Sequence, residues 1–300
     1  MGALATLRES SISPAHTAPV QSIAFGPDPE TFATGDTQRH VRVVVKGEPV
    51  FSLNLSSKQD KVRPTERIRG LAFSPGGETL YVACGDLVQA LSMTSGVARW
   101  SYRPPRSFGF LIVSPIALAV SKAGDVAIAT DAGRMSVWTS EGALKSHWWD
   151  NDSPRLLSFA NGEGLLGTDS FTLASWKAAT GRKQHRQKLR ERAFGFAATP
   201  DGARACIRTI HHVELIDTGS NEVLESYPLE FGPPLVTISS GGDIVAFSGL
   251  NDITVRRVGT DHVHRLQVTG AYVRSLKLSP DGRSVAAGCS DGTLRFWNLD

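Results

Sequence analysis

The chain has 300 residues, of which 41% are hydrophobic and 20% are charged, and its formal net charge is +3 at pH 7. This composition allows a large buried core, and no apolar run approaches the roughly 18 residues that a membrane span needs. The N-terminal residues lack a cationic segment followed by an apolar stretch, so a cleaved secretion signal is not expected.

A unit that reads as short strands separated by tight turns recurs seven times along the chain. In chain order, its innermost strand is predicted at 20–25, 68–73, 115–120, 155–159, 194–198, 235–239 and 273–278. A turn glycine closes the first hairpin of six units, at Gly77, Gly124, Gly162, Gly202, Gly242 and Gly282, so the spacings are 47, 38, 40, 40 and 40 residues. A period of about 40–45 residues with four short strands in each unit predicts a β-propeller, in which every blade buries its faces against its neighbours.

The innermost strands alternate with period two. One face carries large apolar residues such as Ile23 and Phe25, which we expect to form the core between blades. The other face carries small residues such as Ala24 and Ala119, which we expect to point toward the central axis of the ring. Lys277 is the one charged residue of this second set.

The three cysteines are odd in number. Cys84 and Cys289 fall at the same place, the end of the second strand of their units, and Cys206 lies in the unit 194–229. This pattern favours small buried side chains over a disulfide framework. We therefore expect a cytoplasmic protein.

The last unit carries a recognisable motif. Residues 290–298 read Ser-Asp-Gly-Thr-Leu-Arg-Phe-Trp-Asn, and a Ser-Pro-Asp-Gly hairpin at 279–282 precedes them. This stretch resembles the WD-repeat β-propellers, and seven such units cover essentially the whole chain. A tryptophan stands in the third-strand position only at Trp138, Trp176 and Trp297, and the Gly-His dipeptide typical of the family is absent. The resemblance implies a buried Asp-His-Ser/Thr-Trp network, which the last blade matches best.

We predict one all-β domain spanning residues 1–300, a seven-bladed β-propeller of four-stranded antiparallel blades. The predicted blades cover 20–55, 68–102, 115–149, 155–187, 194–229, 235–268 and 273–300. The last of these has only three strands in sequence order. The resemblance implies that an N-terminal strand completes it, and residues 6–12 stand in the right place to close the ring and cover the open sheet edges.

Two connections between blades are longer than the others. Residues 56–67 are polar and basic, whereas residues 103–114 combine arginines with an apolar run. Insertions in repeat proteins map to loops on one face, which is often the binding face. The resemblance implies that both inserts lie on the face called the top, together with the turns between second and third strands.

Basic and aromatic residues are the candidates for partner binding. Strand alignment places three arginines at equivalent positions near the top mouth of the channel, and the inserts add cations and two phenylalanines that would form an apolar anchor if they are exposed. Trp149 follows Trp148 in a strand, so one of the two is expected outside. The predicted partner-binding residues are Arg69, Arg155, Arg274, Lys58, Lys61, Arg63, Arg67, Arg103, Arg106, Phe108, Phe110 and Trp149.

Each of these candidates has a plainer interpretation. The cations form an ordinary solvated rim if Asp60, Glu66, Asp150 and Asp152 offset them, and Phe108 and Phe110 can fold back as a local cap. The basic run 182–192 covers an outer strand, where alternating cations more often protect a sheet edge than bind nucleic acid.

No constellation of catalytic or metal-binding residues stands out in the sequence. The clustered imidazoles, His211-His212 and His262-x-His264, have no further ligands at metal-binding spacing and are interpreted as turn and surface histidines. A phosphate-binding loop and a Gly-x-Ser-x-Gly elbow are both missing. We predict no catalytic residue, cofactor or metal.

These observations favour a non-enzymatic protein–protein interaction module or scaffold subunit that docks a partner on the top face and the two inserts. We expect that partner to be a protein, and we expect no membrane and no small-molecule substrate. The alternative is an enzyme or ligand-binding propeller whose site lies outside the channel. A weaker alternative is a nucleic-acid-associated subunit that uses a basic face, which steep salt dependence would reveal.

Overall fold

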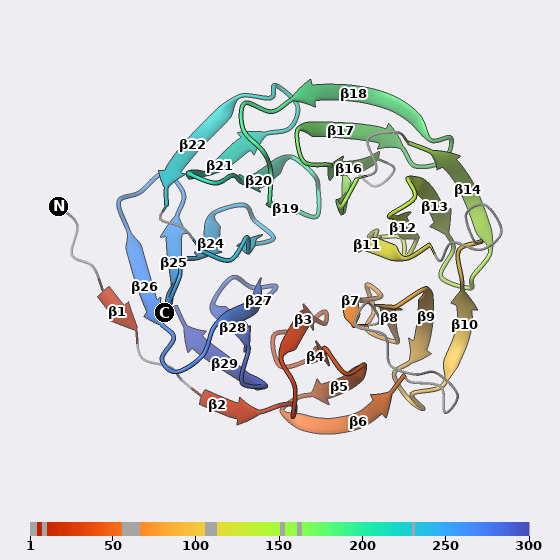
Figure 1. Ribbon diagram of the computed structural model, residues 1–300, viewed down its shortest axis with the longest axis horizontal. Coiled ribbons are helices and arrows are strands. Elements are labelled where there is room, and N and C mark those ends of the chain that lie inside the picture. The colour runs from red at the N-terminus through yellow and green to blue at the C-terminus, as the bar shows by residue number, and fades with distance from the viewer. Residues whose placement is uncertain are drawn as a thin grey trace.

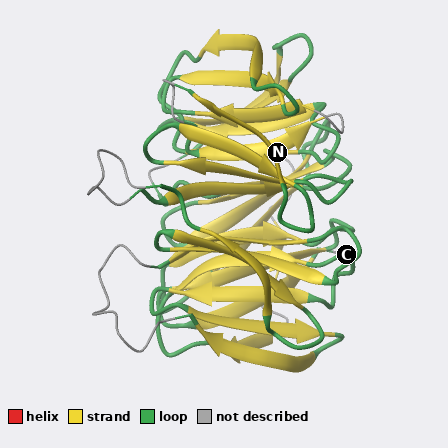
Figure 2. Ribbon diagram, turned by 90° about the vertical axis from the view of Figure 1, so that its right-hand side faces the viewer, coloured by secondary structure: helices red, strands yellow, loops and turns green. Residues whose placement is uncertain are grey.

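The computed structural model shows a ring of β-sheets around a central axis (Figure 1). It describes residues 5–7, 11–55, 67–105, 113–150, 154–160, 164–229 and 232–299. These residues form 29 strands and no helix, and the side view shows a disc with loops on both faces (Figure 2). The described part of the chain thus holds no helix that could cross a membrane.

The first three blades are antiparallel sheets in which strand order follows the chain, from the innermost strand to the outermost. Blade 1 contains β3 (Val20–Phe25), β4 (Phe32–Asp36), β5 (His40–Val45) and β6 (Glu48–Asn54). Blade 2 contains β7 (Ile68–Phe73), β8 (Thr79–Cys84), β9 (Leu87–Ser92) and β10 (Ala98–Tyr102). Blade 3 contains β11 (Pro115–Val120), β12 (Val126–Thr130), β13 (Arg134–Trp138) and β14 (Leu144–Trp149).

The remaining four blades repeat this arrangement. Blade 4 contains β15 (Leu156–Ala160), β16 (Gly164–Thr168), β17 (Thr172–Lys177) and β18 (Arg182–Lys188). Blade 5 contains β19 (Gly195–Ala198), β20 (Arg204–Arg208), β21 (His212–Asp217) and β22 (Val223–Pro228). Blade 6 contains β23 (Val236–Ile238), β24 (Ile244–Ser248), β25 (Asp252–Arg257) and β26 (Val263–Gln267). Blade 7 contains β27 (Val273–Leu278), β28 (Ser284–Cys289) and β29 (Thr293–Asn298). The predicted fold class, a seven-bladed all-β propeller, is confirmed.

An N-terminal strand completes blade 7, as predicted, but its bounds differ from the predicted range 6–12. β2 (Ser11–Pro14) pairs antiparallel with β29, with Ser11 opposite Phe296 and Pro14 opposite Thr293. β1 (Ala5–Leu7) instead pairs in parallel with β26 as a fifth strand of blade 6. The predicted bounds of this strand, residues 6–12, were therefore wrong, because the segment forms two short strands that pair with neighbouring blades.

The core is divided among the boundaries between blades. Among the described residues, each of the seven boundaries has its own cluster of buried apolar side chains. Both faces of an innermost strand contribute: Ile23 packs toward blade 7, whereas Ala24 packs toward blade 2. The expectation that the small residues point to the axis was thus wrong. They are small because the innermost strands of adjacent blades approach closely there.

One face of the disc carries the hairpins that join the second strand of each blade to the third. The outer strands end on the same face, because the first residue after them donates a backbone hydrogen bond to the hairpin, as Leu55 N does to Arg39 O at 3.1 Å and Val268 N does to Asn251 O at 3.1 Å. We call this the hairpin face. It is the face on which the sequence analysis places the partner-binding residues.

Candidate functional site

Two of the three predicted arginines occupy the same structural position. The register between innermost and second strands shifts between Ile68 and Gly70 in blade 2 and between Val273 and Ser275 in blade 7, so Arg69 and Arg274 are each the extra residue of a bulge. Both bulges lie at the hairpin-face end of their strands. Arg155 lies just before β15, where its backbone N–H donates to Thr168 O at 2.9 Å.

The three arginines differ in their surroundings. Arg155 and Arg274 are exposed, and neither has an ion-pair partner among the residues that the structure describes. Arg69 is half-buried, and burial, followed by repulsion from Arg67, lowers its pKa. Arg155 and Arg274 are therefore the members of this group whose charge is most available to a ligand.

Most of the predicted insert residues cannot be placed. Lys58, Lys61, Arg63, Arg106, Phe108 and Phe110 lie outside the described residues. Arg67 is exposed at the edge of its insert. Arg103 Nε lies 3.2 Å from Asp86 Oδ2 in the hairpin of blade 2, so its charge already has a partner.

Trp148 and Trp149 point to opposite faces of their strand, as expected for neighbouring strand residues. Trp149 is 63% exposed at the end of β14, whereas Trp148 packs against the core between blades 3 and 4. Asp150, which was considered as an acidic residue of the rim, is buried. Its carboxylate accepts hydrogen bonds from Trp176 Nε1 at 2.6 Å and Lys183 Nζ at 3.1 Å, so it fastens blade 3 to blade 4.

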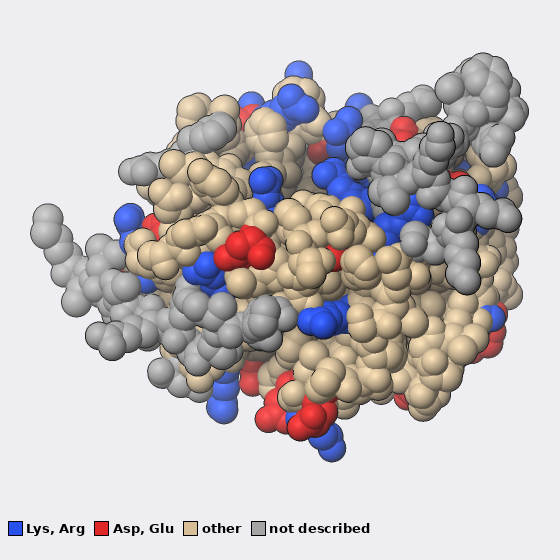
Figure 3. Space-filling view, turned by 60° about the horizontal axis from the view of Figure 1, so that its bottom comes forward, with Lys and Arg blue, Asp and Glu red and all other residues tan. Residues whose placement is uncertain are grey.

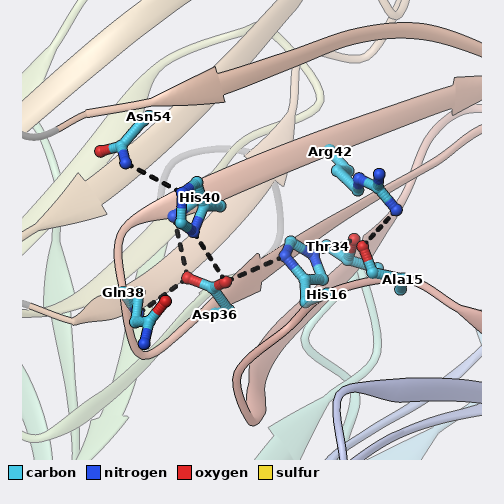
Figure 4. A network of polar contacts seen from close by, with 8 residues as sticks. All are labelled: Ala15, His16, Thr34, Asp36, Gln38, His40, Arg42 and Asn54. Carbon is cyan, nitrogen blue, oxygen red and sulfur yellow. Dashed lines mark hydrogen bonds and ion pairs between the residues drawn. The ribbon is translucent and has the colours of Figure 1, made fainter.

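Blade 1 contains a buried polar network built around one carboxylate (Figure 4). His16 Nδ1 and His40 Nδ1 lie 3.1 Å and 3.0 Å from Asp36 Oδ2, and the backbone N–H groups of Gln38 and His40 donate to Asp36 Oδ1 at 2.8 Å each. The side chains of Asp36 and His16 are 0% and 1% exposed. The carboxylate thus has four donors and almost no contact with water.

The far nitrogen of each imidazole is also occupied. His16 Nε2 lies 2.9 Å from Thr34 Oγ1, and His40 Nε2 accepts from Asn54 Nδ2 at 2.9 Å. Burial alone would raise the pKa of Asp36, but the hydrogen bonds from His16, His40 and Gln38 outweigh it and hold the pKa below its ordinary value. Because no imidazole nitrogen is left to exchange a proton with a substrate, the network is suited to fixing the hairpin and the entry to β3 rather than to acid–base chemistry.

This network corrects an expectation. The resemblance to WD repeats pointed to the last blade for an Asp-His-Ser/Thr-Trp network, but Trp297 Nε1 is buried with no hydrogen-bond partner among the described residues. Three partners of that kind, His16, Thr34 and Asp36, occur in blade 1 instead. The sequence signal was Ala15-His16, which stands just before the first innermost strand in place of Gly-His.

The sequence analysis also missed three apolar residues at hairpin tips. Blades 4, 5 and 6 each have three residues between their second and third strands, and each of these turns carries one large apolar side chain: Phe171, Ile210 and Leu250 are 53%, 47% and 53% exposed. Phe194 and Tyr272, each of which immediately precedes an innermost strand, are 41% and 57% exposed. A single apolar residue in a turn gives no signal for such a group, and only the placement of the turns in one ring shows the group.

The remaining candidate chemistry is limited. The ring centroids of His211 and His212 lie 6.4 Å apart and those of His262 and His264 4.9 Å apart. Across the described ranges, no three His, Cys, Asp or Glu side chains gather in a way that could hold a metal ion. Lys277 is accessible to solvent yet closely surrounded by protein, and this desolvation lowers its pKa. Cys84, Cys206 and Cys289 are buried and form no disulfide within the described residues.

The distribution of charge is uneven. On the side shown in Figure 3, Lys and Arg side chains gather in one area, and Asp and Glu side chains form separate smaller groups. This arrangement is consistent with local basic patches on a chain whose net charge is only +3.

Comparison with known proteins is informative at two places in the chain. The family model for the WD domain, G-beta repeat, matches residues 8–44 and 258–298. The first match contains His16 and Asp36, and the second contains the motif that ends at Trp297. No curated protein matches the chain.

Proposed function

Because this chain is a WD-repeat β-propeller, we propose that it is a non-enzymatic interaction module that docks a protein partner on its hairpin face. The observation that supports this proposal is the placement of Arg155 and Arg274 on blades 4 and 7, exposed on one face and without ion-pair partners in the described part of the chain. Unpaired cations around the mouth of a rigid ring attract an acidic partner and fix its orientation.

The frame suits such a role. Seven core clusters hold the blades together, so the loops of the hairpin face are presented by a stable scaffold. The inserts 56–67 and 103–114 begin on this face, because Leu55 bonds to the hairpin of blade 1 and Arg103 bonds to the hairpin of blade 2. We include these inserts in the docking surface and propose a cytoplasmic location, which three buried cysteines outside any disulfide in the described structure support.

The test begins with the protein that co-purifies with the untagged chain. Reversing both exposed charges, Arg155→Glu with Arg274→Glu, should weaken binding of that partner mainly by slowing association, with little change in melting temperature. The matched control is Arg182→Glu with Lys188→Glu, which reverses two exposed charges on the outer strand β18.

The two pairs of substitutions separate the possible surfaces. If the control pair abolishes binding and the first pair does not, the partner docks on the rim and the proposal fails. If the bound component is nucleic acid, its affinity falls steeply with salt, and the protein-docking function is replaced by the nucleic-acid alternative.

A further inference from the structure

We propose that the hairpin tips of blades 4, 5 and 6 form an apolar arc that binds an extended acidic segment of a partner protein through bulky apolar side chains. This inference rests on the proposed function and specifies the chemistry of the partner. The arc consists of Phe171, Ile210 and Leu250, and it is flanked by Phe194 and Tyr272.

The three turns occupy matching places in successive blades, and of the two residues that each turn encloses, Ile210 and Leu250 are the first and Phe171 is the second. In each, the residue before the turn donates its N–H to the carbonyl oxygen of the residue after it: Asp169 to Thr172 at 3.2 Å, Thr209 to His212 at 2.8 Å and Gly249 to Asp252 at 2.8 Å. The turns are therefore the same length and project from the same face. A single exposed apolar residue in a turn is common, but three in successive turns of one face form a row of apolar side chains.

The other hairpins of this face carry no large apolar side chain. The turns contain residues 37–39 in blade 1 (Thr-Gln-Arg), 85–86 in blade 2 (Gly-Asp), 131–133 in blade 3 (Asp-Ala-Gly) and 290–292 in blade 7 (Ser-Asp-Gly). The apolar tips are thus confined to one sector of the ring. Exposed apolar side chains that cluster in one sector, with charged residues beside them, are typical of a protein-binding surface.

The charges beside the arc favour an acidic partner. Arg192 lies over the ring of Phe194 at 5.0 Å, and Arg155 and Arg274 are exposed on the same face. Two acidic residues of this sector have partners: Asp169 accepts from the backbone N–H groups of Phe171 and Thr172 at 2.6 Å each, and Asp252 pairs with Arg265 at 3.9 Å. A third, Glu191, lies in the chain between the exposed Arg190 and Arg192. Among the described residues, exposed arginines therefore outnumber carboxylates beside the arc.

The geometry of the ring favours an extended chain. Stacked sheets lie about 10 Å apart, so neighbouring tips are separated by about the length of three extended residues. The tips follow a curve around the axis, which a straight helix cannot track across three blades. We therefore expect apolar side chains at intervals of three to four residues, with Asp or Glu between them.

The experiment selects binders from a random 15-residue peptide library displayed on phage, with the full-length protein as bait. Selected peptides are synthesised, and their affinity is measured by fluorescence anisotropy. We expect enrichment of Asp and Glu interleaved with Leu, Ile, Phe or Trp. Phe171→Ser with Leu250→Ser should weaken these peptides about ten-fold or more.

The matched control uses exposed apolar residues of the opposite face. Val97 lies in the turn before β10 and Leu144 begins β14, and they are 64% and 44% exposed. Val97→Ser with Leu144→Ser should change affinity by less than about two-fold, because these residues lie away from the arc. Melting temperatures of both double variants should match that of the parent, since all four side chains are exposed.

The outcomes separate this inference from the proposed function. Selected peptides without apolar residues, or peptides that bind the Phe171/Leu250 variant as tightly as the parent, overturn the arc. If Arg155→Glu with Arg274→Glu still removes binding in that case, the hairpin face remains the docking surface. If neither pair affects the peptides, they bind elsewhere, the arc is overturned, and the proposed function is judged on the co-purified partner alone.

Discussion

Blades 1 and 7 are neighbours in the ring and both match the same repeat family, yet different kinds of side chain stabilise each blade. Blade 1 buries a carboxylate, Asp36, among two imidazoles and two backbone N–H groups. Blade 7 has Cys289 at the position of Asp36. At the third-strand position, blade 7 has the fully buried Trp297, whereas blade 1 has the half-buried Val44.

This difference shows that the repeat preserves backbone geometry rather than a particular set of side-chain contacts. The backbones agree in detail: Gly35 pairs with Val41 in blade 1 as Gly288 pairs with Leu294 in blade 7. The second-strand position that holds Asp36 and Cys289 is buried in every blade. Either a satisfied charge or a small apolar group can fill it.

Removing β2 should have the largest effect, because it opens blade 7 while leaving the sheet of blade 1 complete. Deletion of residues 1–14 exposes the edge of β29, and we expect a larger fall in melting temperature than for any single substitution in either blade, together with aggregation. Deletion of residues 1–10 removes only β1 and should cost much less. Equal melting temperatures for both deletions and the full chain would show that β2 does not close the ring.

The second largest difference between the two blades should come from truncating the residue at the third-strand position, Trp297 in blade 7 and Val44 in blade 1. Trp297→Ala leaves a large cavity and should lower the free energy of unfolding by about 3–5 kcal/mol, whereas Val44→Ala in blade 1 should cost less than about 2 kcal/mol. Urea denaturation monitored by circular dichroism measures both. Similar losses for the two variants would contradict the view that blade 7 depends on its tryptophan.

The carboxylate of blade 1 should matter more than the thiol of blade 7. Asp36→Asn leaves buried donors without a full acceptor and should cost about 2–4 kcal/mol, whereas Cys289→Ala should cost less than about 1.5 kcal/mol. The folded pKa of Asp36 lies below its ordinary value of 3.8, so its contribution is fully present above that pH and is lost as the pH falls through the folded pKa. The difference between parent and Asp36→Asn should therefore be constant near neutral pH and shrink in acid; a constant difference down to acid pH would exclude this role.

Gly292→Ala, at the contact between blade 7 and the segment that leads into blade 1, should cost less stability than the removal of β2, Trp297→Ala or Asp36→Asn. His16 N donates to Gly292 O at 3.0 Å, and a Cβ on Gly292 would clash with the backbone oxygen of His16. Gly292→Ala should cost about 2–3 kcal/mol, from its φ of +83° and this clash, whereas Gly270→Ala, with a φ of +75° and open space around it, should cost about 1 kcal/mol. Thermal unfolding of the two variants compares their stability directly. Equal losses of stability would show that the backbone of blade 1 at His16 shifts to accommodate the added Cβ.

Periodicity predicted the fold because each blade repeats local signals. The turn glycines and alternating strands give the period, and four of the seven innermost strands begin and end where the sequence places them, as β3 and β27 do. The interaction face was anticipated less completely. Arg155 and Arg274 were identified by strand alignment, but Phe171, Ile210 and Leu250 were not, since an apolar residue in one turn carries no signal until the ring places the turns side by side.

The sequence by itself determined the number of blades and the approximate position of their strands, because these depend on spacing and on the two-residue repeat of a β-strand. Only the tertiary structure decided how the N-terminus divides between β26 and β29, and which buried position receives His16. These contacts join residues far apart in the chain, such as Ser11 and Phe296, so no local pattern encodes their register. They follow from the requirement that every sheet edge and buried charge in a closed ring find a partner.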